Sequence, residues 1–141
     1  MADIDIHVKK SGIVPRTLVA EGSRGGLFAS EEKQLPFRVR RVYAISGVGE
    51  GISRGGHAHK QNDQAMFVLR GALTLHLDDG EDTQSVRLSN TDEGVRLAPM
   101  LWHSMDDFTE DCVVLVLASL PFDESDYIHD YNTFKGMSQP E

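Results

Sequence analysis

Two histidines, His57 and His59, are the side chains whose type and spacing most directly indicate chemistry in this sequence. They stand two positions apart in the run Arg54-Gly55-Gly56-His57-Ala58-His59, inside a segment that otherwise has a strand pattern. Because side chains two apart on a strand point to the same face of a sheet, we expect both imidazoles to face one side. Two titratable groups facing one cavity suit either a metal site or an acid–base site.

Positive charges are concentrated in the middle of a chain that is acidic as a whole. With 14 Lys+Arg against 22 Asp+Glu, the formal net charge is -8 at pH 7. Because phosphate-backbone binding needs a basic surface, we expect no nucleic acid as a partner. A local positive site for one small phosphorylated ligand is compatible with this balance. The basic residues of the middle segment are Arg38, Arg40, Arg41, Arg54, Lys60 and Arg70.

Short β-type runs separated by turn residues predict an all-β fold from about residue 27 onward. Apolar residues alternate in segments 38–45 and 73–77, and further strands are expected at 66–69, 84–88, 94–98, 102–108 and 112–118. The last segment is continuously apolar, which predicts a central strand covered on both faces. This pattern is typical of an antiparallel sandwich or a small barrel.

The tail has the helical pattern of this sequence. Tyr127, Tyr131 and Phe134 recur at i, i+4 and i+7, and carboxylates gather near the start, where the helix dipole favours them. We expect a short C-terminal helix that closes an open end of the sheets. Residues 1–12 and about 136–141 are expected to be poorly ordered.

Length and composition predict a single domain over residues 1–141, because the chain is long enough for one core and too short for two ordinary domains. No apolar run approaches the roughly 20 residues that span a bilayer, and the first residues do not have the pattern of a signal peptide. We therefore expect a cytoplasmic protein with no membrane partner. Cys112 lies in an apolar run, which predicts a buried, inert thiol.

A longer spacing extends beyond the paired histidines. The run Gly51-x5-His57-x-His59-x4-Gln64-x6-Gly71 resembles the first signature motif of the cupin superfamily, and Gly94, Pro99 and His103 resemble a degraded second motif. This resemblance implies a double-stranded β-helix, or jelly roll, with a pocket between its two sheets. The strand pattern described above agrees with that architecture.

Gln64 stands where metal-binding cupins carry a glutamate. A neutral amide adds no negative charge to a divalent cation, so a site of His57, His59, His103 and Gln64 should bind metal more weakly than a site with a carboxylate. Three neutral imidazoles can still hold zinc. The sequence therefore favours chemistry without a metal or other cofactor, while a metal site remains an open alternative.

A narrower resemblance rests on several motifs in a fixed order. These are Arg41-Val42-Tyr43, Arg54-Gly55-Gly56-His57-Ala58-His59-Lys60, Leu77-Asp78-Asp79-Gly80, Trp102-His103-Ser104-Met105, Val116-Leu117-Ala118-Ser119 and Asp123-Glu124-Ser125-Asp126-Tyr127-Ile128-His129-Asp130-Tyr131. Together they resemble the nucleotide-linked 4-keto-6-deoxyhexose 3,4-ketoisomerases, the WxcM-like group. The similarity extends from about residue 24 to residue 134.

This resemblance implies an isomerase that moves the carbonyl of a dTDP-linked 4-keto-6-deoxyhexose from C4 to C3 through an enediolate. The chemistry needs a base for the C3 proton, a donor to C4 and hydrogen bonds to the enediolate. We assign His57 as the base and His59 as the group that shuttles or positions the second proton, and the reverse order stays open. Tyr43 is assigned a hydrogen bond to the developing oxyanion, with a plain core role as the alternative.

Further residues are candidates for substrate binding. Arg54 suits the diphosphate or an enediolate oxygen, because a guanidinium presents a rigid fork of donors. Arg41 and Arg24 are weaker phosphate candidates, and either can come from a neighbouring subunit. Gln64 can bind a sugar hydroxyl. His103 and Trp102 are expected to line the pocket, with a core role for Trp102 as the alternative.

Three other functions compete with this one. The first is a related cupin epimerase acting at C3 and C5 of the same kind of sugar, the second a metal-dependent cupin oxygenase, and the third a non-catalytic sugar-nucleotide-binding cupin. By analogy, the ketoisomerase product feeds an aminotransferase in deoxy-amino-sugar biosynthesis for a polysaccharide or natural product. We also expect a homodimer with exchange of an N-terminal strand, because pairing across subunits would cover an exposed edge.

Overall fold

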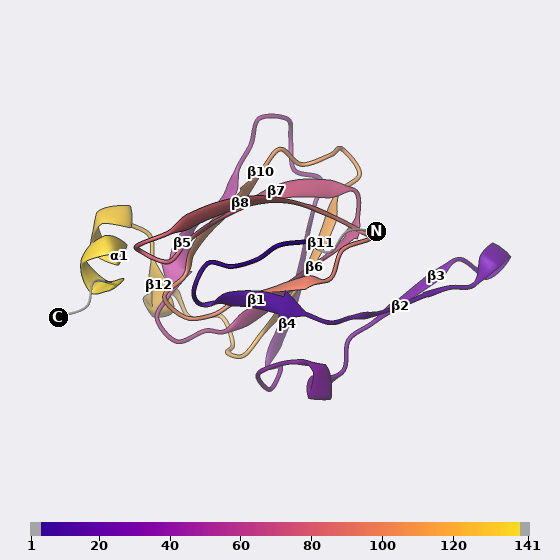
Figure 1. Ribbon diagram of the computed structural model, residues 1–141, viewed down its shortest axis with the longest axis horizontal. Coiled ribbons are helices and arrows are strands. Elements are labelled where there is room, and N and C mark those ends of the chain that lie inside the picture. The colour runs from indigo at the N-terminus through magenta and orange to yellow at the C-terminus, as the bar shows by residue number, and fades with distance from the viewer. Residues whose placement is uncertain (1–3, 139–141) are drawn as a thin grey trace.

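Two antiparallel sheets form the computed structural model, which describes residues 4–138 (Figure 1). The first sheet has the order β1-β9-β6-β11-β4, with β1 (Ser11–Val14), β4 (Arg41–Ser46), β6 (Gln64–Arg70), β9 (Gly94–Leu97) and β11 (Val113–Ala118). The second has the order β12-β5-β10-β7-β8, with β5 (Arg54–His59), β7 (Ala72–Asp78), β8 (Thr83–Ser89), β10 (Trp102–Asp106) and β12 (Tyr127–Ile128). The prediction of an all-β, double-sheet fold is confirmed.

The main core lies between the two sheets, because alternate residues of the facing strands are apolar. Leu73, Leu75 and Leu77 on β7 are at most 1% exposed, and they share one cluster with Met66 of β6 and Val116 of β11. Burying such side chains is the main favourable term in folding. The period of two in the sequence therefore decides which face of each strand turns inward.

The apolar strand β11 is central, as predicted, because it lies between β6 and β4. Its Val114 and Val116 face the main core, while Leu117 packs with Phe67 in a second cluster on the other face. Partly buried residues between positions 28 and 39 cover that second cluster. The prediction that Cys112 is buried is also confirmed, because this free cysteine is 3% exposed.

The pairing of β5 with β10 determines where the paired histidines lie. His57 is opposite His103, and the register shifts between His103 and Ser104. Gly55 has φ +84, and a Cβ at this position would lie 3.0 Å from the carbonyl oxygen of His103. Glycine is required here because the backbones approach closely in a conformation that other residues rarely adopt.

The C-terminal helix is confirmed, but it begins later than the sequence pattern indicates. Helix α1 covers Tyr131–Ser138, and residue Tyr127 belongs to strand β12, where it pairs with His59. Phe134 is fully buried and packs beside Trp102, with ring centroids 5.6 Å apart. The i, i+4, i+7 pattern spans two elements, because Tyr127 lies on β12 with its ring beside His59, whereas Phe134 lies on α1 and packs with Trp102.

The expectation of poor order is wrong for residues 4–12. Val8 is 2% exposed, and Ile4 and Ile6 pack against the main core. Strand β1 pairs with β9 from Ser11 onward. At the other end, residues 136–138 belong to α1, whereas positions 1–3 and 139–141 lie outside the described residues.

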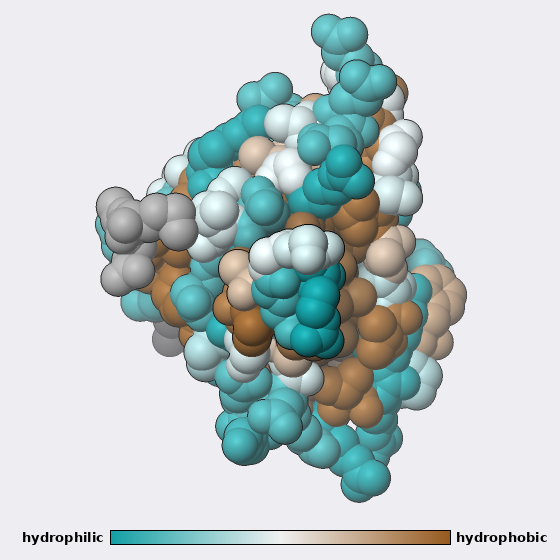
Figure 2. Space-filling model, turned by 90° about the vertical axis from the view of Figure 1, so that its right-hand side faces the viewer, coloured by the Kyte–Doolittle hydropathy of each residue, from teal (hydrophilic) through white to brown (hydrophobic). Residues whose placement is uncertain are grey.

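A hairpin of β2 (Thr17–Ala20) and β3 (Gly26–Ala29) extends away from the two sheets, with the short helix η1 (Gly22–Arg24) at its tip (Figure 1). A second short helix, η2 (Glu32–Gln34), follows, and η3 (Glu124–Asp126) precedes β12. The hairpin exposes Leu18, Val19 and Leu27. Figure 2 looks onto this end of the molecule and shows hydrophobic side chains gathered beside the polar tip.

Among residues 4–138, no helix has the length and apolar character needed to cross a bilayer.

The buried ring of Phe134 should contribute strongly to stability, although it lies on the last helix. We expect Phe134→Ala to lower the free energy of unfolding by about 3–5 kcal/mol, because the substitution leaves a cavity against Ala58, Ile128 and Trp102. Urea denaturation followed by circular dichroism measures this change. The control is Met137→Ala on the same helix, which is 50% exposed and should change stability by less than about 0.5 kcal/mol. Equal stabilities of the two variants would contradict the packing described here.

Candidate active site

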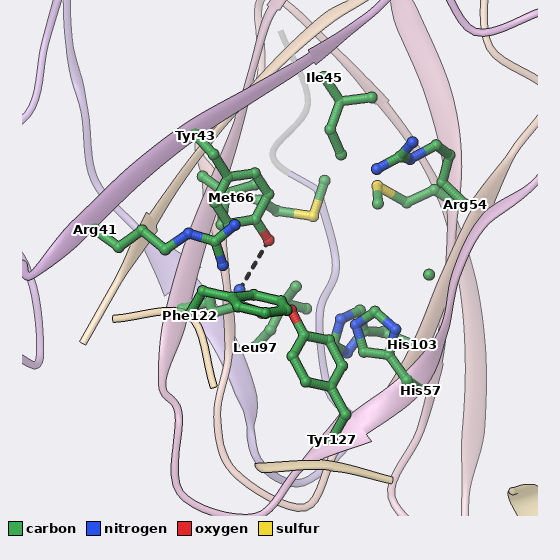
Figure 3. A pocket seen from close by; sticks show the side chains of 14 residues that line it. Arg41, Tyr43, Ile45, Arg54, His57, Met66, Leu97, His103, Phe122 and Tyr127 are labelled. Atoms are coloured by element: carbon green, nitrogen blue, oxygen red, sulfur yellow. Dashed lines mark hydrogen bonds between the residues drawn. The ribbon is translucent and has the colours of Figure 1, made fainter. Parts of the chain in front are cut away.

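A cavity of about 240 Å³ lies between the two sheets, and Figure 3 shows its lining. Strands β4, β6 and β11 supply one wall, and β5 and β10 supply the other. The segment after β11 closes the side of the cavity with two aromatic residues. The lining residues are Arg41, Tyr43, Ile45, Arg54, Gly55, His57, Gln64, Met66, Leu97, His103, Met105, Val116, Phe122 and Tyr127.

Three imidazoles meet at one end of this cavity. The ring centroid of His57 lies 5.0 Å from that of His59 and 4.9 Å from that of His103. One ring nitrogen from each histidine lies within 4.8 Å of the others. The prediction that His57 and His59 face the same side of a sheet is therefore confirmed. His57 lines the cavity directly, while His59 lies behind it and is 2% exposed.

Burial keeps these imidazoles neutral. The pKa of His57 is lowered to about 3, mainly by loss of hydration and further by the neighbouring His103, His129 and Arg54. Burial likewise lowers the pKa of His59 to about 4, although Asp126 opposes the effect. The pKa of His103 is also lowered to about 4, mainly by burial. At neutral pH all three rings are therefore available to accept protons or to bind a cation.

Tyr43 and Gln64 form a polar pair on the opposite wall. The Gln64 side-chain amide donates a hydrogen bond to the Tyr43 hydroxyl over 2.9 Å, reaching across the intervening strand β11. Burial raises the pKa of Tyr43, so its hydroxyl keeps its proton at neutral pH. Because that oxygen already accepts from Gln64, its own proton can point toward a bound molecule. The Oε1 atom of Gln64 is buried and has no hydrogen-bond partner among the described residues.

Two arginines bring positive charge to this cavity. Arg41 lies over the ring of Tyr43, with 4.4 Å between its guanidinium carbon and the ring centroid, and 5.2 Å from the ring centroid of Phe122. Contact with two aromatic rings holds the guanidinium in place. Arg54 lies on the facing wall, and Figure 3 shows both side chains beside the cavity. An acidic protein thus has a local positive site, as the clustering of basic residues indicates.

Two of the nine candidate residues lie elsewhere. The prediction that Trp102 lines the pocket is wrong, because its ring packs against Tyr131 and Phe134 on the outside of the sheet. Strand alternation explains this, since Trp102 and His103 are neighbours on β10 and point to opposite faces. Arg24 lies in η1 at the hairpin tip, away from this cavity within the chain. A role for Arg24 in a neighbouring subunit stays a prediction.

Two aromatic residues of the lining, Phe122 and Tyr127, are not among the candidates that the sequence indicates. Tyr127 was assigned to the helix, but its ring centroid lies 4.9 Å from that of His57 and 4.4 Å from that of His59. Phe122 is 60% exposed, which is unusual for so large an apolar ring. The signal for both was the Asp123–Tyr131 motif, which contains Tyr127 and directly follows Phe122. Only the chain's return to β5 shows that Tyr127 contacts the histidines and that Phe122 packs beside Tyr127 and Arg41.

The three imidazoles are also the group of described residues that could hold a divalent cation. Neutral ring nitrogens in this number suit zinc, and the cation would act there as a Lewis acid on a carbonyl oxygen. Gln64 offers an amide oxygen in place of a carboxylate, so such a site would lack a negative ligand.

A jelly roll with paired histidines and a Tyr–Gln pair in its cavity defines a cupin-type enzyme site. The family model described as FdtA, WxcM-like, C-terminal matches residues 13–139. A curated TDP-4-oxo-6-deoxy-alpha-D-glucose-3,4-oxoisomerase from Aneurinibacillus thermoaerophilus is 45% identical over 114 residues, covering 80% of this chain and 82% of that protein. The chain therefore belongs to the FdtA, WxcM-like family and is an isomerase.

Solved structures agree with this assignment. QdtA, a sugar 3,4-ketoisomerase from Thermoanaerobacterium thermosaccharolyticum in complex with TDP, matches with a TM-score of 0.88 and 33% identity, covering 94% of this chain and 96% of that one. A 3,4-ketoisomerase from Helicobacter canadensis matches with a TM-score of 0.85 and 32% identity, covering 94% and 98%. The rmlC epimerase of Mycobacterium tuberculosis is 17% identical at a TM-score of 0.73, covering 90% and 72%, which shows the shared fold alone. The expected cupin fold is confirmed.

The neutral, buried histidines make stability depend on pH. Their pKa values are lowered on folding, so the unfolded chain binds more protons below about pH 6.5 and the native state loses stability as pH falls. We expect His103→Asn to lose less stability than the wild type between pH 7.5 and pH 5, by up to about 2 kcal/mol for the one imidazole removed. Urea denaturation at the two pH values measures this difference. Parallel losses in both proteins would show that His103 is protonated in the native state.

Proposed function

We propose that this chain moves the keto group between C4 and C3 of a dTDP-linked 4-keto-6-deoxyhexose. The pair of neutral imidazoles on β5, facing a cavity that has arginines beside it, is the observation that carries this proposal. The relatives support it: one is named for the same oxo-sugar, and a variant of QdtA carrying a histidine-to-asparagine change was crystallised with TDP-4-keto-6-deoxyglucose.

The reaction requires a proton to leave C3 and a proton to reach C4. In our proposal His57 removes the C3 proton, because it lines the cavity and its ring nitrogens make no hydrogen bond to a described residue. Electrons from the C3–H bond form the C3–C4 double bond of an enediolate, and the C4 oxygen takes the negative charge. A proton passes from the C3 hydroxyl to the C4 oxygen, and the proton taken from C3 returns to the C4 carbon, with His59 shuttling or positioning it, so that the product has a carbonyl at C3 and a hydroxyl at C4. The reverse order of the two histidines remains the alternative.

The opposite wall would stabilise the enediolate. The Tyr43 hydroxyl, fixed as an acceptor toward Gln64, is proposed to donate its proton to the developing oxyanion. The unpartnered Oε1 of Gln64 would accept from a sugar hydroxyl. Arg54 and Arg41 are proposed to bind the diphosphate, and His103 contributes to the imidazole-lined end of the cavity.

The reaction redistributes one carbon-bound hydrogen and the associated electrons within the sugar, so no external oxidant or reductant enters the balance. We propose that this activity requires no cofactor. A 3-keto sugar is the substrate class that an aminotransferase converts to a 3-amino sugar, which agrees with the proposed place in deoxy-amino-sugar and polysaccharide biosynthesis. We place the reaction in the cytoplasm, as expected for a sugar nucleotide pathway.

A homodimer with N-terminal strand exchange is part of the proposal. Strand β4 is an edge of its sheet, and Val42 on it is 58% exposed. The projecting hairpin exposes apolar Leu18, Val19 and Leu27, which a second copy would cover. Edge strands and projecting apolar hairpins are protected from nonspecific pairing when a partner occupies them.

Replacing His57 should abolish the proposed reaction. We expect His57→Asn to lower the rate by about 10²–10⁴-fold, because asparagine cannot act as a general base. The assay incubates chelator-treated protein with dTDP-4-keto-6-deoxyglucose in deuterated water and follows carbon and proton NMR. The expected result for the wild type is a carbonyl at C3 and no deuterium at C5.

The matched control is His76→Asn, whose imidazole bonds Ser85 and Asp106 outside the cavity and should leave the rate unchanged. Deuterium at C3 and C5 with the carbonyl kept at C4 would indicate an epimerase. Ligand binding with no exchange would indicate a sugar-nucleotide-binding protein. Activity that appears only after zinc, iron or manganese is added would contradict the cofactor-free chemistry.

The hairpin should determine the oligomeric state. We expect a dimer by light scattering coupled to size-exclusion chromatography, and we expect Leu18→Lys combined with Leu27→Lys to weaken it at least about tenfold, since two charges would be buried. Met137→Lys is the control and should leave the dimer unchanged, because Met137 belongs to α1, which lies at the end of the molecule opposite the hairpin in Figure 1. A wild-type monomer at micromolar concentration would contradict strand exchange.

A further inference from the structure

A buried carboxylate, Asp126, contacts the second histidine of the pair. Its Oδ2 atom lies 3.1 Å from Nδ1 of His59, and the two side chains are 9% and 3% exposed. Asp126 does not line the cavity, so it reaches a bound molecule only through His59. The two residues are 67 positions apart in the sequence, and the fold alone brings them together.

The loop that follows β5 holds this carboxylate in place. The backbone N–H of Gln61 donates to Oδ1 over 2.7 Å, and that of Asn62 donates to Oδ2 over 3.2 Å. Lys60 donates its own N–H to the backbone carbonyl of Asp126 over 2.9 Å. Because both carboxylate oxygens already accept from backbone donors, the side chain has one fixed orientation toward His59.

The strand pairing that follows maintains the same geometry. Tyr127 pairs with His59 and Ile128 with Ala58, so Asp126 directly precedes the β12–β5 ladder. The short helix η3 is capped by Asp123, whose side chain accepts from the backbone of Ser125. A capped turn therefore places the carboxylate directly before β12, the strand that pairs with the strand of its histidine partner.

The other nitrogen of His59 has no partner. Its Nε2 atom is buried and makes no hydrogen bond to any described residue. In a neutral imidazole one nitrogen carries the proton and the other has a lone pair, and a carboxylate accepts only from the protonated one. We infer that Asp126 is a positioning residue that holds His59 with its proton on Nδ1 and a free lone pair on Nε2.

This inference rests on the proposed function and deepens it. In the ketoisomerase reaction His59 can accept a proton at Nε2 while Nδ1–H still donates to the carboxylate. The resulting imidazolium is stabilised by that negative charge, and return of the proton from Nε2 restores the starting state. Within residues 4–138, His57 has no such carboxylate partner. Asp126 therefore gives the two histidines different properties and prepares His59 for the proton shuttle.

The tautomer of His59 can be measured without any activity. Long-range proton–nitrogen NMR on the wild-type protein at pH 7.5 distinguishes a protonated Nδ1 from a protonated Nε2, with assignment by comparison to His59→Asn. We expect His59 to carry its proton on Nδ1. A proton on Nε2 would overturn the inference, whatever the enzyme does. Absence of the 3-keto product in a protein with the expected tautomer would instead overturn the proposed function alone.

Asp126→Asn tests the consequence for the reaction. An amide can donate to Nδ1, which would move the histidine proton to Nε2 and remove the acceptor there. We expect kcat to fall about 10²-fold or more with KM changed less than about threefold, together with the altered NMR tautomer. A kcat within threefold of the wild type would overturn the inference.

The matched control is Asp123→Asn, which makes the same carboxylate-to-amide change at the cap of the same short helix but touches no histidine. It should keep both the wild-type kcat and the wild-type tautomer of His59. A fall in kcat equal to that of Asp126→Asn would show that the turn acts only as scaffold, which also overturns the inference. If Asp126→Asn does not fold, the wild-type tautomer measurement decides the question.

Discussion

The placement of strand β5 between β10 and β12 is the constraint on which the rest of the site depends. Pairing with β10 puts His57 opposite His103, and pairing with β12 puts His59 opposite Tyr127. The close approach at Gly55 permits the first of these pairings, because a side chain there would meet the backbone of β10. Three imidazoles therefore meet at one end of the cavity through ordinary ladder geometry.

Desolvation then gives these rings their chemical state. Packing between two sheets lowers the pKa of each histidine far below its value in water, and the neighbouring imidazole lowers it further, so the rings stay neutral. Positive charge enters the cavity instead through Arg41 and Arg54. Neutral bases at one end and fixed cations along the walls suit a substrate that combines a keto sugar with a negatively charged diphosphate.

The cavity also depends on a contact that crosses a strand. Tyr43 and Gln64 lie on β4 and β6, which are separated by β11, and their hydrogen bond crosses that strand diagonally, since Tyr43 is paired with Val116 and Gln64 with Ala118. The bond leaves the Tyr43 hydroxyl free to donate its own proton toward the cavity. The same bond engages the NH₂ group of Gln64, which would otherwise face the cavity without a partner. The position that carries glutamate in metal-binding cupins is thus used here for a neutral polar contact.

Local sequence patterns determined much of this protein. Alternation of apolar residues predicted the strands and the inward face of β7, the continuous apolar run predicted the central place of β11, and the spacing of His57 and His59 predicted a shared face. These features could be predicted because a strand's side-chain period of two is a local property. The same rule, applied to Trp102 and His103 as neighbours on one strand, excludes one of the two from the cavity.

Other features were decided by tertiary structure alone. Tyr127 has the spacing of a helical residue, yet pairing with β5 makes it a strand residue beside the histidines. Asp126 meets His59 only because the chain returns to β5 after a long separation, and residues 4–12 are ordered by packing on a core built from later strands. No local pattern encodes such contacts, because burial and hydrogen bonding between distant segments depend on where the whole chain places them.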